Sequence, residues 1–178
     1  MNLFTDTSNK YIIFSLFNDE KIIDYFVKET DRNQSEIFVD ELNIFLNKNN
    51  VELKTISNFY FANGPGSFTG IRVGLTFAKA LISSGYKNVY TINSLEVLFD
   101  NYENSKAIID ARGNKYYFQE VKDNIFLEPK IVDSSTVELE NINTYDNEIN
   151  NIGNHVFELI KMKRYNKEIE SNYLKEAF

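Results

Sequence analysis

Residues 59–74 read FYFANGPGSFTGIRVG, and this stretch decides the fold of the chain. It opens with a short apolar and aromatic run that is typical of a buried strand. Glycine, proline and serine then break the run, and an apolar segment with helical spacing follows. The sequence therefore predicts a strand, a glycine loop and a helix, in that order.

The glycine loop has two possible uses. The first N–H groups of a helix lack partners inside it and favour anions, so the loop could hold a phosphate. Alternatively, it is a tight structural turn, in which Gly64, Gly66 and Gly70 allow backbones to approach closely. Ser67 or Thr69 could cap the helix in either case. We expect a structural element with at most a weak phosphate contact, because the Lys that usually faces a nucleotide phosphate is missing.

The known catalytic loops do not match. A Walker A loop has Lys and Ser or Thr after its last glycine, where this chain has Ile71 and Arg72. A dinucleotide fingerprint needs glycine in place of Thr69, and a nucleophile elbow centred on Ser67 needs glycine in place of Pro65 and Thr69. We therefore predict no catalytic residue in this chain.

The composition restricts the function further. With 178 residues, the chain is one ordinary domain or two small subdomains. It has no Cys and one His, which leaves no disulfide, no thiolate metal site and no HExxH motif, so we expect no metal. A net charge of −7 with scattered bases argues against autonomous nucleic-acid binding. No signal peptide or membrane-length apolar run is visible, which predicts a cytoplasmic protein without a membrane partner.

Several motifs together resemble the signature of one family. Residues 64–72, GPGSFTGIR, look like the central motif of the bacterial TsaB (YeaZ) proteins. Four further landmarks of that family follow the same order along the chain, with some replaced residues: Asp6–Ser8, Gln34–Glu36, Ile109–Arg112 with Tyr117, and Glu170–Lys175. The resemblance spans nearly the whole chain and is strongest before Tyr117.

The resemblance implies a fold and a role. The fold would be α/β, an actin-like ATPase (ribonuclease-H-like) fold with subdomains at residues 1–98 and 99–178, the second shortened. The role would be that of a non-catalytic partner of a TsaD-type subunit. With a TsaE-type ATPase, ATP and threonylcarbamoyl-AMP, that complex makes N6-threonylcarbamoyladenosine beside the anticodon of tRNA. The chain would reach tRNA only through the complex, and a homodimer is possible. The alternative is a stand-alone small ATPase or kinase of the same fold, which would bind or hydrolyse ATP alone.

Hydrophobic patterns predict a mixed sheet flanked by helices. We expect an antiparallel meander of strands at 2–6, 10–17 and 21–27, then a helix at 34–48. A strand at 59–62, a helix at 69–83 and a strand at 89–92 follow, and Ser94 looks like the cap of a helix reaching about residue 102. The second part opens with a hairpin, 106–111 and 115–121. Residues 138–151 read as a loop, 148–152 as a possible strand, and Asn154 as the cap of a helix to 163.

The helix after the glycine loop carries two apolar stripes. Ile71, Leu75, Ala78 and Ile82 form one, and Val73, Phe77 and Ala80 form the other. The second stripe is either internal core or a surface for a partner, and the family resemblance favours the partner. Ile37 and Ile44 lie off the core stripe of the preceding helix and extend the predicted interface.

Three charged residues are candidates for the nucleotide side. In actin-like ATPases, an acid at the end of the first strand, here Asp6, contacts a metal–nucleotide through water; a turn is the other interpretation, and we favour it. Asp110 and Arg112 are two residues apart on a strand and would point to one face. They could orient a substrate or partner, although a structural ion pair or a cap of the hairpin is the simpler expectation.

Overall fold

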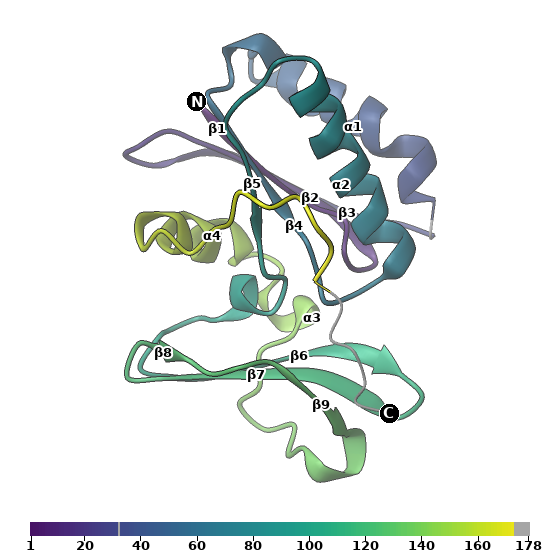
Figure 1. Ribbon diagram of the computed structural model, residues 1–178, viewed down its shortest axis with the longest axis vertical. Coiled ribbons are helices and arrows are strands. Elements are labelled where there is room, and N and C mark those ends of the chain that lie inside the picture. The colour runs from purple at the N-terminus through teal and green to yellow at the C-terminus, as the bar shows by residue number, and fades with distance from the viewer. Residues whose placement is uncertain (32, 173–178) are drawn as a thin grey trace.

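A five-stranded mixed sheet forms the first half of the computed structural model, which describes residues 1–31 and 33–172 (Figure 1). The strand order is β3-β2-β1-β4-β5. The bounds are β1 (Asn2–Asp6), β2 (Tyr11–Phe17), β3 (Ile22–Glu29), β4 (Asn58–Ala62) and β5 (Val89–Ile92). The first three strands form the predicted antiparallel meander, whereas β4 pairs in parallel with β1 and β5 in parallel with β4.

Two helices cover one face of this sheet (Figure 1). They are α1 (Gln34–Lys48) and α2 (Phe68–Ser83), each within one residue of its predicted bounds. Ser67 is the N-cap of α2, and its side chain accepts a hydrogen bond from the Gly70 N–H, which confirms one of the two predicted caps. A short 3-10 turn, η1 (Leu53–Thr55), precedes β4.

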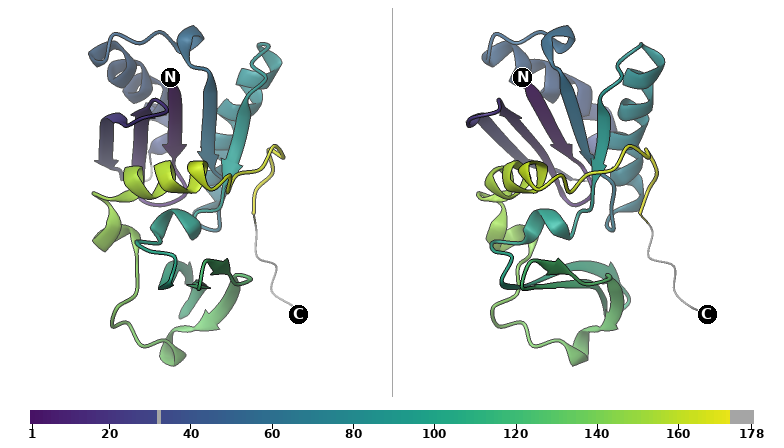
Figure 2. Two further views of the ribbon diagram at one scale, coloured as in Figure 1. Left: turned by 90° about the vertical axis from the view of Figure 1, so that its left-hand side faces the viewer. Right: turned by 60° about the vertical axis from the view of Figure 1, so that its left-hand side comes forward.

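The second half is a four-stranded antiparallel sheet built around β7 (Figure 2). β7 (Lys115–Lys122) pairs with β6 (Asn104–Arg112), β8 (Ile125–Phe126) and β9 (Lys130–Asp133). The β6–β7 hairpin was predicted, but β8 and β9 were not. The sheet is followed by the 3-10 turn η3 (Ser134–Thr136) and the one-turn helix α3 (Tyr145–Glu148).

The chain then returns to the first sheet. Helix α4 (Ile152–Lys161) lies on the face opposite α1 and α2, as both views of Figure 2 show. A Cβ atom on Gly153 would lie 2.9 Å from the ring of Tyr25, so glycine allows the helix to approach β3 closely. The Phe157 ring meets the Phe17 ring of β2 edge-on, with 5.9 Å between centroids. Residues beyond the predicted boundary at 98/99 therefore complete the packing of the first sheet.

Two apolar cores follow from this arrangement. The alternation of side chains along β2 sends Ile12, Phe14 and Leu16 toward α1 and α2, and Ile13 and Phe17 toward α4 and the second half. The central strands are thus buried on both faces, which explains why β2 and β4 have near-continuous apolar sequences; β1 is equally buried but includes the polar residues Asn2, Thr5 and Asp6.

Four predictions for the chain after β5 were wrong. The helix expected from Ser94 to residue 102 is only a 3-10 turn, η2 (Glu96–Leu98). Leu95, Val97, Leu98 and Phe99 are all buried, so this run lacks the polar side that a surface helix needs. The strand expected at 148–152 is absent: α3 ends at Glu148 and α4 begins at Ile152, with Asn151 rather than Asn154 as its N-cap. The segment 138–151 is not a simple loop, because it contains α3 and a bridge between Asn143 and Ala107.

Candidate functional site

The glycine loop is packed against the turn that follows β1. The Ser67 N–H donates to the Ser8 carbonyl at 2.6 Å, and the Thr7 hydroxyl donates to the Gly70 carbonyl at 2.7 Å. A Cβ atom on Gly66 would lie 2.2 Å from the Ser8 oxygen, and one on Gly70 would lie 1.9 Å from the Thr7 oxygen. The two glycines are therefore needed where one backbone passes directly over another, which is the structural use of the loop.

The other members of the loop have different surroundings. Gly64 has a φ of +102°, a conformation that L side chains rarely adopt, and its N–H donates to the Ser94 hydroxyl at 2.9 Å. The Gly64 carbonyl accepts from the Ser94 N–H at 2.8 Å. Thr69, the alternative cap, is exposed in the first turn of α2. The loop thus holds three segments together: the β1 turn, the start of α2 and the residues after β5.

Asp6 lies at the end of β1, beneath this loop, in a buried hydrogen-bond network. The Tyr145 hydroxyl donates to Asp6 Oδ2 at 2.6 Å, and the Ser8 N–H donates to Asp6 Oδ1 at 2.6 Å. The hydroxyls of Ser8 and Ser94 continue the network, with Ser8 Oγ 3.2 Å from the Tyr145 hydroxyl and 3.0 Å from Ser94 Oγ. Both oxygens of the carboxyl group therefore have donors from within the chain.

Burial determines the pKa shifts of the titratable groups in this network. Asp6 is 1% exposed, and burial raises the pKa of its carboxyl group, although hydrogen bonds from Tyr145 and Ser8 act in the opposite direction. Burial also raises the pKa of the Tyr145 phenol well above its usual range, and the nearby Asp6 carboxyl adds to the shift. Within the described part of the chain, no group of three or more His, Asp or Glu side chains could hold a metal ion.

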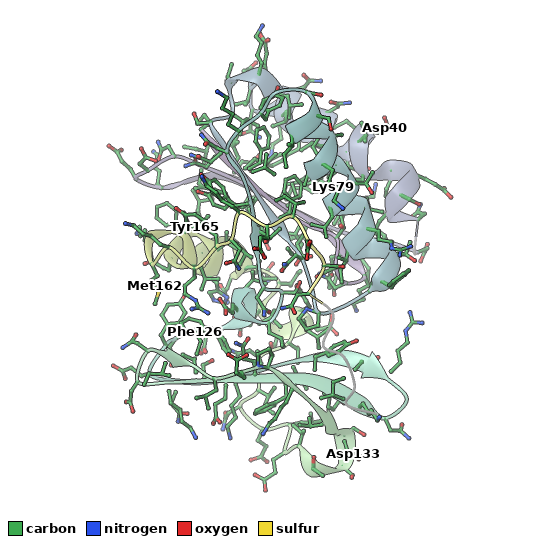
Figure 3. The ribbon with its side chains drawn as sticks, in the orientation of Figure 1. Asp40, Lys79, Phe126, Asp133, Met162 and Tyr165 are labelled. Carbon is green, nitrogen blue, oxygen red and sulfur yellow. The ribbon has the colours of Figure 1, made fainter. Side chains whose placement is uncertain are left out.

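The outer sides of α1 and α2 are the second candidate site. Four of the nine exposed large apolar side chains among the described residues lie on these two helices: Val39, Ile44, Phe68 and Ile82. Asp40 of α1 and Lys79 of α2 are exposed on the layer formed by these two helices (Figure 3). Scattered exposed apolar residues are ordinary, but their concentration on one helix pair marks a candidate surface for a protein partner.

The five predicted interface residues do not form one patch. Ile37 and Ile44 belong to the same i, i+4, i+7 row of α1 as Glu41, whose carboxylate pairs with Lys28 of β3 at 2.5 Å. This row faces the β3 edge and points away from α2. Ile44 is 62% exposed, whereas Ile37 is half-buried against the core.

The three residues on α2 lie on the side that faces α1. The Phe77 ring contacts Phe38 of α1 and Phe61 of β4 edge-on, with centroid distances of 5.4 and 6.3 Å. Val73 is also half-buried against this core, and Ala80 is exposed. Phe77 therefore contributes to the packing of its own chain, and the exposed part of this side is at Ala80.

Asp110 and Arg112 do not share a strand face, so that prediction was wrong. The register of the β6–β7 hairpin shifts between them, and Arg112 has a φ of +64°. The Asp110 carboxylate accepts from the Arg112 N–H at 2.7 Å. Both residues are exposed at the end of the hairpin and form part of its turn, which agrees with the alternative expectation of a cap of the hairpin.

The single histidine of the chain, His155, is buried in the first turn of α4. His155 is 8% exposed, and its Nδ1 lies 3.0 Å from the Val97 carbonyl. It borders an open cavity of about 440 Å³ between α4 and the residues after η2, which also includes Glu148 and Glu158. This cavity is separate from both candidate sites.

The segment after α4 lies against β5 and the glycine loop. Thr91 and Asn166 exchange backbone hydrogen bonds of 2.8 and 2.9 Å, and the Asn172 N–H donates to the Asn63 carbonyl at 2.7 Å. This segment includes Glu170, the first residue of the last family landmark; Tyr173 to Lys175 lie outside the described residues. The landmark therefore begins beside the glycine loop, far from it in sequence but adjacent in space.

Sequence reasoning missed Tyr145. It lies in a stretch rich in Asn and Glu, which we interpreted as a loop because such composition is typical of exposed segments. The local signal was present in the Thr144 capping box, in which the Thr144 hydroxyl accepts from the Asn147 N–H and the Asn147 side chain accepts from the Thr144 N–H. The contact between Tyr145 and Asp6 spans 139 positions and has no signature in a single sequence.

Comparison with known proteins gives a consistent result. The family model described as "TsaD: tRNA N6-adenosine threonylcarbamoyltransferase" matches residues 28–152. The tRNA threonylcarbamoyladenosine biosynthesis protein TsaB of Bacillus subtilis is 30% identical over 116 residues, covering 63% of this chain and 51% of the relative. The protein of the same name from Haemophilus influenzae is 32% identical over 113 residues, covering 60% and 47%. The chain spans about half the length of these curated relatives.

The solved structures resemble the chain in fold. YeaZ from Pseudomonas aeruginosa superposes with a TM-score of 0.65 at 18% identity, covering 78% of this chain and 70% of that one. Together with the sheet order β3-β2-β1-β4-β5, this likeness confirms the predicted actin-like, ribonuclease-H-like fold. Every helix in the described ranges is too short or too polar to cross a membrane.

Proposed function

The chain belongs to the TsaB (YeaZ) family, and on that premise we propose that it is a non-catalytic subunit of a complex that makes N6-threonylcarbamoyladenosine on tRNA. It would bind a TsaD-type catalytic subunit and support it. In that complex, a TsaE-type ATPase and threonylcarbamoyl-AMP would supply energy and the transferred group, and tRNA would contact other subunits. A cytoplasmic location follows from this role, and a second copy of the chain could occupy the same surface when the catalytic subunit is absent.

The observation that supports a partner-binding role is the concentration of exposed apolar side chains on α1 and α2. Val39, Ile44 and Ile82 are 52%, 62% and 45% exposed, so a helix pair that already covers its own sheet leaves much of their apolar surface in contact with solvent. The net charge of −7 agrees with a protein partner, since a chain that held tRNA by itself would need a basic surface.

The alternative, a stand-alone ATPase or kinase, has less support. The acid at the end of β1 that could serve a metal–nucleotide already accepts hydrogen bonds from Tyr145 and Ser8. The glycine loop is packed on Thr7 and Ser8 at distances that leave no room for a Cβ atom. We therefore expect no steady ATP turnover by the isolated chain, and turnover that Asp6→Ala abolishes would favour the enzyme instead.

Two surface variants test the partner surface. Ile44→Asp and Ala80→Asp place a charge on the exposed sides of α1 and α2, where the free chain has no need of an apolar group. Burying an isoleucine contributes about 1.5–3 kcal/mol, so Ile44→Asp should weaken binding to the TsaD-type subunit by roughly 10- to 100-fold. Isothermal titration calorimetry with the purified catalytic subunit measures the affinity.

The matched control is Ile125→Asp on β8, because Ile125 is 63% exposed but lies on the second sheet. It should bind the catalytic subunit like the wild type. Thermal melting of all three variants checks that each chain stays folded. If both helix variants bind with wild-type affinity, the helix pair is not the partner surface.

A further inference from the structure

Residues 143–149 contact both halves of the molecule. On one side, Asn143 exchanges backbone hydrogen bonds with β6, from its N–H to the Lys106 carbonyl (2.8 Å) and from the Ile108 N–H to its own carbonyl (3.0 Å). Its side-chain amide donates to the Leu98 carbonyl at 2.9 Å and to Asp100 at 2.8 Å. These contacts fix the start of the segment to the second sheet.

The rest of the segment is attached to the first sheet by side chains. The Tyr11 hydroxyl donates to Asp146 at 2.7 Å, and Lys10 pairs with the same carboxylate at 2.9 Å. The Tyr25 hydroxyl donates to the Ile149 carbonyl at 2.6 Å. These three contacts are exposed or partly buried, whereas the bond from Tyr145 to Asp6 is buried between the two halves.

Tyr145 is connected to α2 through a short path of buried hydrogen bonds. Its hydroxyl donates to Asp6, which also accepts from the Ser8 N–H. The Ser8 carbonyl in turn accepts from the N–H of Ser67, the N-cap of α2. The Asp6–Ser8 turn is therefore bound by α3 on one side and by the start of α2 on the other.

We propose that Tyr145 is a positioning residue that fixes the start of α2, so that docking of the second half controls the geometry of the helix pair. A buried carboxyl group that loses a donor is costly, so without the hydroxyl the Asp6–Ser8 turn shifts and releases the N-cap of α2. The link to partner binding rests on the proposed function, but the link between Tyr145 and α2 does not.

The test is amide hydrogen exchange of Tyr145→Phe, which removes only the hydroxyl. Peptides covering residues 64–75 should exchange about tenfold faster than in the wild type, because a buried hydrogen bond is lost and its acceptor is left without that donor. Peptides covering β7, residues 115–122, should be unchanged. Tyr116→Phe is the matched control: it removes a hydroxyl from β7 and should leave residues 64–75 unaffected.

A double-mutant cycle with Asp6→Asn separates positioning from general support. If Tyr145 acts through Asp6, the two substitutions together should change exchange at residues 64–75 by less than the product of their separate effects. Equal acceleration in both peptides, or independent effects of the two substitutions, would overturn the proposal. If Tyr145→Phe does not fold, Asp6→Asn alone, which changes the group that accepts from the Tyr145 hydroxyl, provides the same comparison between the two peptides.

Affinity for the purified TsaD-type subunit provides the second measurement. Tyr145→Phe should weaken binding several-fold while Tyr116→Phe does not, and unchanged affinity would overturn the link between Tyr145 and the partner surface. If the wild-type chain does not bind the subunit at all, the proposed function fails. The exchange data still decide whether Tyr145 positions α2.

Discussion

Replacing Gly70 with alanine tests whether the glycine loop is a packed structural element. In an ordinary helix the change should stabilise the chain by about 0.5–1 kcal/mol, because alanine loses less backbone entropy on folding. Here the new Cβ would lie 1.9 Å from the Thr7 oxygen, whereas ordinary contact begins at 3.4 Å. The two backbones must separate by the difference, 3.4 − 1.9 = 1.5 Å.

That separation would break two buried hydrogen bonds, from Thr7 to the Gly70 carbonyl and from the Ser67 N–H to Ser8. Each costs about 1–3 kcal/mol when its partner is left unsatisfied, so the steric effect exceeds the gain in helix propensity. We expect a net loss of about 2–4 kcal/mol and a fall in melting temperature of about 4–16 °C.

Thermal melting and urea unfolding measure the change. Gly74→Ala is the graded control in the same helix, because its Cβ would lie 3.1 Å from the Thr7 hydroxyl oxygen, and a shift of a few tenths of an ångström relieves that contact while the bond from Thr7 to the Gly70 carbonyl is kept. It should unfold within about 1 kcal/mol of the wild type. A Gly70→Ala variant at least as stable as the wild type would refute the packing argument and reopen the loop as an open ligand site.

Three further substitutions have defined outcomes. Arg164→Ala leaves the buried Glu96 carboxylate without its ion-pair partner. It should lower the free energy of unfolding, measured in urea, by about 1–3 kcal/mol, a range that allows for the partial exposure of Arg164. An unchanged urea midpoint would contradict this. Phe77→Asp should destabilise the monomer by about 3 kcal/mol or more, because the ring packs on α1 and β4; wild-type unfolding would place it outside the core. The Asp6 pKa is raised in the fold, so its contribution to stability is present below pH 3.8 and is lost as pH rises through the folded-state pKa. In urea unfolding measured at a series of pH values, Asp6→Asn should therefore become more stable relative to the wild type as pH increases above 3.8. If the stability difference between the two proteins does not change with pH, the pKa of Asp6 is not raised by folding.

The first half of the fold could be predicted from sequence because each element carries a local signal. The strands alternate or are continuously apolar, α1 has a single core stripe, and the glycine loop marks the start of α2 within one residue. The meander was predictable because short turns leave adjacent strands no other pairing. Close packing of the loop was only one of two interpretations, since sequence does not reveal that Ser8 lies opposite Gly66.

The second half was harder for physical reasons. The run around Val97 is buried on all sides by contacts from other segments, so apolar content there does not indicate a helix face. Residues 138–151 look exposed in composition, yet Tyr145 and Asn143 are fixed by hydrogen bonds to residues more than 35 positions away. The predicted interface residues on α1 and α2 lie on different sides of the helix pair for a related reason. Helical periodicity places Ile44 off the core stripe of α1, but it does not show whether that side of α1 faces α2 or β3.

The return of α4 to the first sheet has a consequence for synthesis of the protein. Ile13, Phe17 and Tyr60 are in place early on the ribosome, but Ile152, Val156 and Leu159, which cover that face, emerge about 90 residues later at the least. A fragment of residues 1–98 would leave this apolar face open to water and should aggregate during expression. The first sheet is thus completed only after most of the chain has left the ribosome, and a nascent chain halted midway would depend on chaperones to stay dispersed.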